Sequence, residues 1–129
     1  MTLPVKYAVD APTLPDGFVV VVKQECETCQ TVVPALAQLA QNVRLTVYTQ
    51  DEPGFPESPT AIDDTSLAVS WHHDIETVPT LIKIENGVEV NRTIGVSRSA
   101  WESFTGVDSL APYLPACLFY TPYRADDPP

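Results

Sequence analysis

The sequence predicts a single domain of the α/β class, because stretches typical of strands and of helices alternate along its 129 residues. Residues 18–22 form a short, apolar and mostly β-branched run, which is typical of a central strand covered on both faces. A stripe of apolar residues at helical spacing comes next, at Val32, Leu36, Leu39 and Val43. Further on, Asn86-Gly87 separates the strand-like residues 80–84 and 88–90 and predicts a hairpin with a two-residue turn.

Proline residues shape the predicted middle of the chain. Pro34 falls inside the first helix, where it removes one hydrogen bond and is expected to bend the axis, and Asn42 suits the end of that helix. Residues 43–48 alternate apolar and polar side chains, which predicts a second strand with unequal faces. Residues 49–64 are rich in proline and acidic residues without periodicity, so a long loop is expected there.

Two further helices are predicted in the second half of the chain. A short one over residues 65–71 can be capped by Asp64 or Thr65. A last one is expected to start at Ser99, which is followed three residues later by a glutamate at the spacing of a capping box, and to end near Gly106. Each start and stop therefore has a local physical reason.

The overall composition limits the classes of partner. We expect the domain to span residues 1–110 and residues 111–129 to form an irregular, proline-rich tail. The formal net charge is −10 with only seven basic residues, which disfavours binding to nucleic acid or to an anionic membrane. No membrane-spanning stretch and no signal peptide is recognisable, so a soluble cytoplasmic protein is expected.

The three cysteines are an odd set, which argues against a secreted disulfide framework. Cys26 and Cys29 have the C-x-x-C spacing that, in a cytosolic protein, indicates redox chemistry or metal binding. A zinc site completed by His72, His73 and Cys117 is an alternative, but a second closely spaced pair is missing. Cys117 is interpreted as a packed or incidental thiol, and no metal is expected.

Several features in a fixed order resemble the thioredoxin family over residues 16–104. They are the C-x-x-C after an apolar strand, Pro34 five residues beyond it, Val78-Pro79-Thr80, the Asn86-Gly87 turn and Gly95. The resemblance implies a thioredoxin-like three-layer fold, with a mixed central sheet flanked by helices, a reduced N-terminal helix and a long proline-rich loop at 49–64. It also implies a cis Val78–Pro79 bond facing the cysteines, with the backbone of Val78 pairing to an extended substrate segment.

The cysteine spacing suits dithiol–disulfide exchange. Cys26 at the start of a helix is expected to be accessible and to attack as a thiolate, and Cys29, one turn later, is expected to resolve the mixed disulfide. Glu25 and Glu27 disfavour the thiolate by like charge, and Lys23 offsets part of this effect, which predicts a reducing pair.

The expected function is that of a protein-disulfide oxidoreductase. Its partners would be a disulfide-containing protein or a small thiol and an electron donor, without an organic cofactor, because the two sulfurs transfer the electrons. The departures from the family include Glu27-Thr28 between the cysteines and Val20 where a buried aspartate is common. They leave a second hypothesis, a binding or redox-sensing module that uses the acidic loop 49–64 as its contact.

Overall fold

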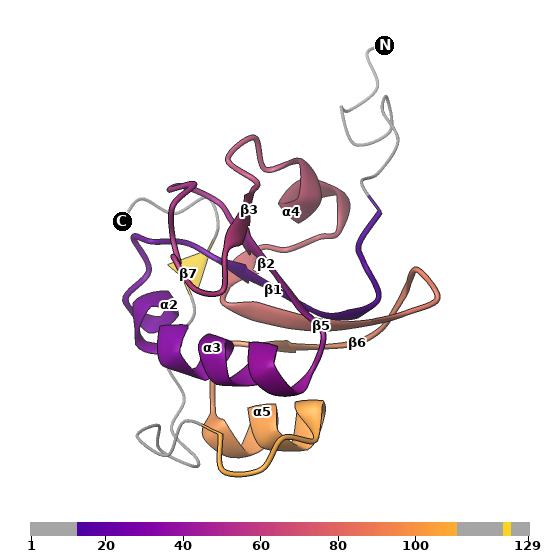
Figure 1. Cartoon of the computed structure of the whole chain (residues 1–129). Helices are drawn as coiled ribbons and strands as arrows, with labels where there is room; N and C mark the ends of the chain where they lie inside the picture. The colour runs from indigo at the N-terminus through magenta and orange to yellow at the C-terminus, as the bar shows by residue number, and fades with distance from the viewer. Residues whose placement is uncertain (1–12, 111–122, 125–129) are drawn as a thin grey trace.

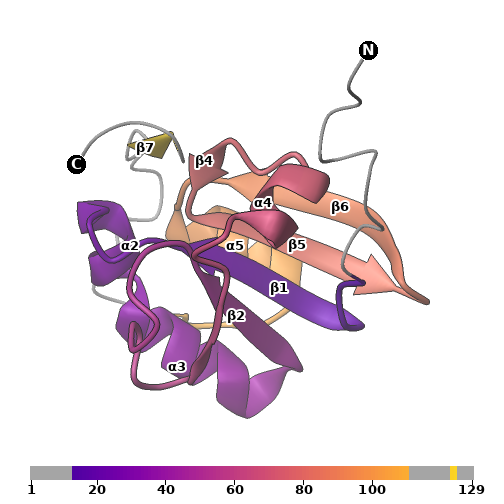
Figure 2. The same ribbon diagram turned by 90° about the horizontal axis from the view of Figure 1, so that it is seen from above.

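A computed structural model describes residues 13–110 and residues 123–124; Figure 1 labels its elements except β4, which Figure 2 labels. In chain order they are β1 (Gly17–Val22), α2 (Glu27–Thr31), α3 (Val33–Asn42), β2 (Leu45–Thr49), β3 (Ala61–Asp63), α4 (Ala68–His72), β4 (Thr77–Val78), β5 (Thr80–Glu85), β6 (Val88–Ile94), α5 (Arg98–Thr105) and β7 (Tyr123–Arg124). The structure therefore has four helices in its described part.

Five strands form one mixed sheet in the order β3-β2-β1-β5-β6. Strand β1 is parallel to β2, and β2 to β3, whereas β5 is antiparallel to both β1 and β6. Helices α3 and α5 lie below the sheet in Figure 1, and α4 lies above it. The predicted α/β class, with a mixed central sheet and helices on both sides, is confirmed.

Strand β1 is the centre of the core. The valines at 19–22 are fully buried, which confirms the prediction of a strand covered on both faces. Phe18 at its start packs edge-on against Phe104 of α5, with ring centroids 5.7 Å apart. Neighbouring elements contribute further fully buried side chains to this core, among them Leu36, Leu39, Leu81, Ile82 and Trp101.

The predicted first helix is interrupted. Instead of one bent helix, α2 ends at Thr31 and α3 begins at Val33, so the expectation of a single helix with Pro34 in its interior is wrong. Pro34 lies in the first turn of α3, where its missing N–H costs no hydrogen bond. The predicted end at Asn42 is confirmed.

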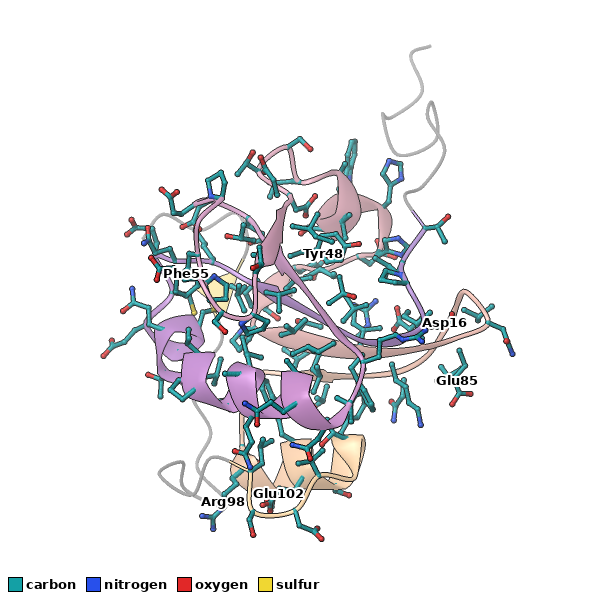
Figure 3. All side chains as sticks on the ribbon, viewed as in Figure 1. Asp16, Tyr48, Phe55, Glu85, Arg98 and Glu102 are labelled. Atoms are coloured by element: carbon teal, nitrogen blue, oxygen red, sulfur yellow. The ribbon has the colours of Figure 1, made fainter. Side chains whose placement is uncertain are left out.

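Strands β2 and β3 differ from expectation in two ways. Val47, Tyr48 and Thr49 are all buried, so both faces of β2 are covered at its C-terminal end, and the prediction of one buried and one exposed face is wrong there. Residues 61–63 of the predicted loop form strand β3 and extend the sheet, which covers the outer edge of β2. Figure 3 shows Tyr48 on the side of the sheet that α4 covers. Burial is the main reason that the pKa of Tyr48 is raised, and the negative charge of Asp64 raises it further.

Helix α4 begins at Ala68, three residues later than predicted, and its N-cap is Leu67, so the prediction of Asp64 or Thr65 as the N-cap is wrong. The Asp64 side chain nevertheless binds the first turn of this helix. The Asp64 carboxylate is 2% exposed and accepts hydrogen bonds from the backbone N–H groups of Val69 at 2.8 Å and Ser70 at 3.0 Å. The Ser70 hydroxyl donates to the same carboxylate at 2.7 Å. These bonds satisfy N–H groups that a short helix otherwise leaves without acceptors.

The hairpin prediction is confirmed, whereas the predicted cap of the last helix is wrong. Asn86 and Gly87 both have positive φ, at 54° and 76°, as a two-residue turn between β5 and β6 requires. The N-cap of α5 is Ser97, whose hydroxyl accepts from the Ala100 N–H at 3.1 Å, and not Ser99. The carboxylate of Glu102 instead accepts from the Leu110 N–H at 2.8 Å.

The helix ends as predicted at Gly106, which has a left-handed φ of 76°. Residues 123–124 form strand β7, so the expectation that the C-terminal tail contains no regular element is wrong at these two positions.

Gly17 allows the close approach of β1 to the segment before β2. Its φ is +108°, and a Cβ at this position would lie 2.7 Å from the Arg44 carbonyl oxygen. We expect Gly17→Ala to lower the free energy of unfolding by about 2 kcal/mol or more, because it adds both backbone strain and a clash. Urea unfolding measures this change.

Gly54→Ala is the matched control for this substitution. The nearest atom to a Cβ at position 54 is a flexible Glu52 carboxylate oxygen at 3.8 Å. Its effect should stay within about 0.5 kcal/mol. Equal effects of the two substitutions would show that the approach at Gly17 is not constrained.

Candidate functional site

Cys26 and Cys29 lie where the chain leaves strand β1 and enters helix α2. Cys26 is the N-cap of α2, and its Sγ accepts a hydrogen bond from the Cys29 backbone N–H at 3.3 Å. The Cys26 N–H donates to the carbonyl of Lys23 at 3.1 Å. The sulfur thus takes the place that a side-chain oxygen has in most N-caps, and the predicted position of the pair at a helix start is confirmed.

Both cysteine side chains are fully buried, and they are not joined in a disulfide. The expectation that Cys26 is accessible to solvent is therefore wrong in this structure. Access matters because a thiolate must reach the sulfur that it attacks. The Cys26 thiol is enclosed by structure that the local sequence around the motif does not reveal.

The environment of Cys29 favours its neutral form. Burial raises the pKa of the Cys29 thiol well above its ordinary value, and the hydrogen bond and charge interaction with Cys26 raise it further. A backbone hydrogen bond from Lys23 lowers this pKa, and the charge of Asp51 raises it, both by less than burial does. Cys29 is therefore held as a protonated thiol next to the sulfur of Cys26.

Strand β4 brings a segment from far along the chain to this pair. The Cys26 thiol donates to the carbonyl oxygen of Val78 at a sulfur–oxygen distance of 3.9 Å, across 52 positions of sequence. Val78 and Pro79 are both buried, and the peptide bond between them is cis, as predicted. The structure thus unites the two segments that the sequence analysis assigned to one site.

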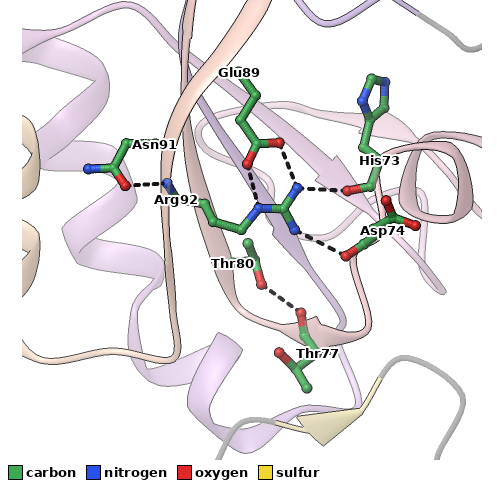
Figure 4. Close-up of polar contacts among 7 residues, drawn as sticks. All are labelled: His73, Asp74, Thr77, Thr80, Glu89, Asn91 and Arg92. Carbon is green, nitrogen blue, oxygen red and sulfur yellow. Dashed lines mark hydrogen bonds and ion pairs between the residues drawn. The ribbon is translucent and has the colours of Figure 1, made fainter.

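Arg92 of β6 holds the segment that leads into β4 (Figure 4). Its guanidinium donates to the carbonyl oxygens of His73 at 2.7 Å and Asp74 at 3.0 Å, while two bonds of 2.6 Å join it to the Glu89 carboxylate. Within this region, the hydroxyl of Thr80, the first residue of β5, donates a hydrogen bond to the carbonyl of Thr77 in β4 at 2.8 Å. No sequence motif indicated this role, because it depends on which strand lies beside residues 73–74.

Asp51 is a second residue that sequence reasoning missed. It lies two residues after the end of β2 and accepts hydrogen bonds from the backbone N–H groups of Gln24 at 2.7 Å and Glu25 at 3.0 Å. Its carboxylate therefore orders the turn immediately before Cys26. An aspartate after a strand that is parallel to β1 was the available signal, because parallel strands end at the same edge of a sheet.

The three predicted tuning residues differ in exposure. The side chains of Glu25 and Glu27 are exposed, whereas Lys23 is only 9% exposed. Glu27 lies in the first turn of α2, and Glu25 immediately precedes Cys26. The structure thus places both acids beside the pair while solvent screens their charge.

The residues of the zinc alternative are not assembled around the pair. His72 ends helix α4, and Figures 1 and 2 show α4 away from α2. Cys117 lies outside the described residues. Within residues 13–110, no group of three or more His, Cys, Asp or Glu side chains is arranged to hold a metal ion.

Removing the Asp51 carboxylate should destabilise the turn before Cys26. We expect Asp51→Ala to lower the free energy of unfolding by about 1–2 kcal/mol, because two charge-assisted hydrogen bonds at a partly exposed position are lost. Urea unfolding measures the change. Glu57→Ala is the matched control, since Glu57 is an exposed acid of the same connection whose carboxylate makes no hydrogen bond within the described residues, and an equal loss there would contradict the assignment.

The raised pKa of Cys29 predicts a pH dependence of stability. Above the ordinary cysteine pKa of 9.0, the unfolded chain loses the Cys29 proton while the folded chain keeps it, so stability falls as pH rises. The free energy of unfolding of wild type relative to Cys29→Ala should be constant below about pH 8. It should then fall by up to about 1.4 kcal/mol per pH unit above pH 9. A difference that stays flat to pH 10.5 would contradict the pKa direction.

Comparisons with known proteins assign no identity to the chain. No model of a known protein family matches the sequence, and no curated protein matches it. In the part of the chain that the structure describes, no helix is long and apolar enough to cross a membrane. The features that bear on function are the contacts among Cys26, Cys29 and Val78.

Proposed function

We propose that this chain is a thioredoxin-like protein-disulfide oxidoreductase that works through Cys26 and Cys29. The observation that supports this most directly is the position of the Cys26 sulfur between the Cys29 N–H at 3.3 Å and the Val78 carbonyl at 3.9 Å. A nucleophile, a second thiol and a backbone group that can receive an extended chain thus lie within one small region. The same elements follow one another in the order that resembles the thioredoxin family.

The proposed reaction transfers two electrons. The Cys26 thiolate attacks one sulfur of the substrate disulfide, the substrate S–S bond breaks, and the other substrate sulfur leaves and takes up a proton. Cys29 then attacks the Cys26 sulfur of the mixed disulfide while its proton passes to the leaving substrate sulfur, so the bond between Cys26 and the substrate breaks and the second substrate thiol is released. The substrate disulfide is reduced to two thiols, and the chain ends with a Cys26–Cys29 disulfide that an external dithiol must reduce.

The environment of the pair supports work in the reducing direction. Burial disfavours the thiolate of Cys29. The exposed side chains of Glu25 and Glu27 add negative charge beside the pair. When the thiolates are poorly stabilised, the dithiol form is less favoured relative to the disulfide, and the pair gives up its electrons more readily. No organic cofactor enters this scheme, because both electrons come from the sulfurs.

The test is the reduction of insulin by dithiothreitol, followed by the turbidity of the released chains. Wild type should accelerate the reaction, and Cys26→Ser should return it to the uncatalysed rate, because the attacking sulfur is lost. Cys117→Ser is the matched control and should keep most of the activity. A wild-type protein that does not accelerate the reaction would reject the proposal and favour a binding module that uses the acidic loop 49–64.

A further inference from the structure

Strand β7 pairs with the segment that lies against Cys26. Tyr123 is opposite Val78 and Arg124 is opposite Thr77, in an antiparallel arrangement. Among the described strands, β4 pairs with β7 alone and with no strand of the five-stranded sheet. In Figure 2, β7 lies beside β4, on the side of the molecule where α2 lies.

This edge of β4 is also where the proposed function requires a substrate to bind. Val78 provides the carbonyl that is 3.9 Å from the Cys26 sulfur, so β7 pairs with the same residue that contacts that sulfur. A strand edge offers one row of backbone donors and acceptors and pairs with one strand at a time. Strand β7 and an incoming extended segment therefore cannot both occupy it.

The burial of the thiols agrees with an occupied edge. Cys26 and Val78 are both fully buried, although a thiol that attacks a disulfide on another molecule must be reachable. The pairing of β7 extends over only two residue pairs, so few backbone hydrogen bonds hold it on β4. A partner strand can therefore displace it at modest cost.

We propose that β7 takes the place of the substrate strand on β4, so that the C-terminal segment of this chain competes with an extended peptide of the substrate. This inference rests on the proposed function. The charges near the edge define the kind of peptide that fits best. Glu25, Glu27 and Glu76 are all exposed on the segments that flank Cys26 and β4, which favours a segment containing a basic residue.

The test replaces both residues of β7 by proline in the full-length protein, which removes every N–H that β7 could donate to β4. The rate at which iodoacetamide alkylates Cys26 in the reduced protein, assigned by mass spectrometry, should rise at least about fivefold. Asp127→Pro is the matched control, because it adds the same residue to the same segment outside β7, and it should leave the rate unchanged. Unchanged alkylation in the double proline variant would overturn the inference.

Two further measurements separate this inference from the proposed function. A synthetic peptide with the sequence of residues 121–126 should slow alkylation of the double proline variant again, and a peptide with glutamate in place of Arg124 should protect less. No protection by either peptide would overturn the inference. If alkylation becomes faster but no variant reduces insulin, the competition at β4 stands and the proposed function is rejected.

A second variant covers the case in which the double proline variant does not fold. Tyr123→Gly with Arg124→Gly weakens strand formation without removing N–H groups, and it should accelerate alkylation in the same direction by a smaller factor. An unchanged rate in a folded glycine variant would also overturn the inference.

Discussion

The candidate site depends on the position of strand β1 in the middle of the sheet. This strand is hydrogen-bonded to β2 on one edge and β5 on the other, and its valines at 19–22 are buried on both faces. Burial of each such side chain contributes about 1.5 kcal/mol or more. The end of β1 is therefore a rigid point from which the turn to Cys26 starts.

The other parts of the site reach that point from neighbouring strands. Strand β2 ends parallel to β1 and places Asp51 against the turn at residues 24–25. Strand β5, antiparallel to β1, begins at the same end of the sheet, so the preceding Val78 arrives beside Cys26. Arg92 on β6 holds the approach to β4 through two backbone carbonyls. Each contact follows from the strand order, which determines which chain ends meet.

The chemistry of the pair shows a conflict between stability and reactivity. Burial holds Cys29 as a neutral thiol and encloses Cys26, which suits a packed core and disfavours attack on a large substrate. The pairing of β7 with β4 offers a physical way to reconcile these demands, because a two-residue strand can leave without unfolding the sheet. Reactivity would then be governed by the occupancy of one strand edge.

Local patterns in the sequence were sufficient for features that depend on neighbouring residues. The run at 18–22 indicated a central strand, Asn86-Gly87 a hairpin, and the C-x-x-C a pair at a helix start, because side-chain size and backbone preference act over a few residues. They failed where a distant segment decides the outcome. The strand at 61–63 forms because β2 has an open edge, and Tyr48 is buried because another element covers it.

For the candidate site too, some features follow from the sequence and others only from the tertiary structure. The sequence by itself determined the two cysteines, their spacing and the Val-Pro segment, which are the residues on which the proposed chemistry depends. Only the tertiary structure decided that Asp51 orders the turn before Cys26, that both thiols are buried, and that β7 lies against β4. These contacts join residues 26 or more positions apart or depend on the packing around them, and such contacts arise from the order of strands in the sheet, which no local pattern encodes.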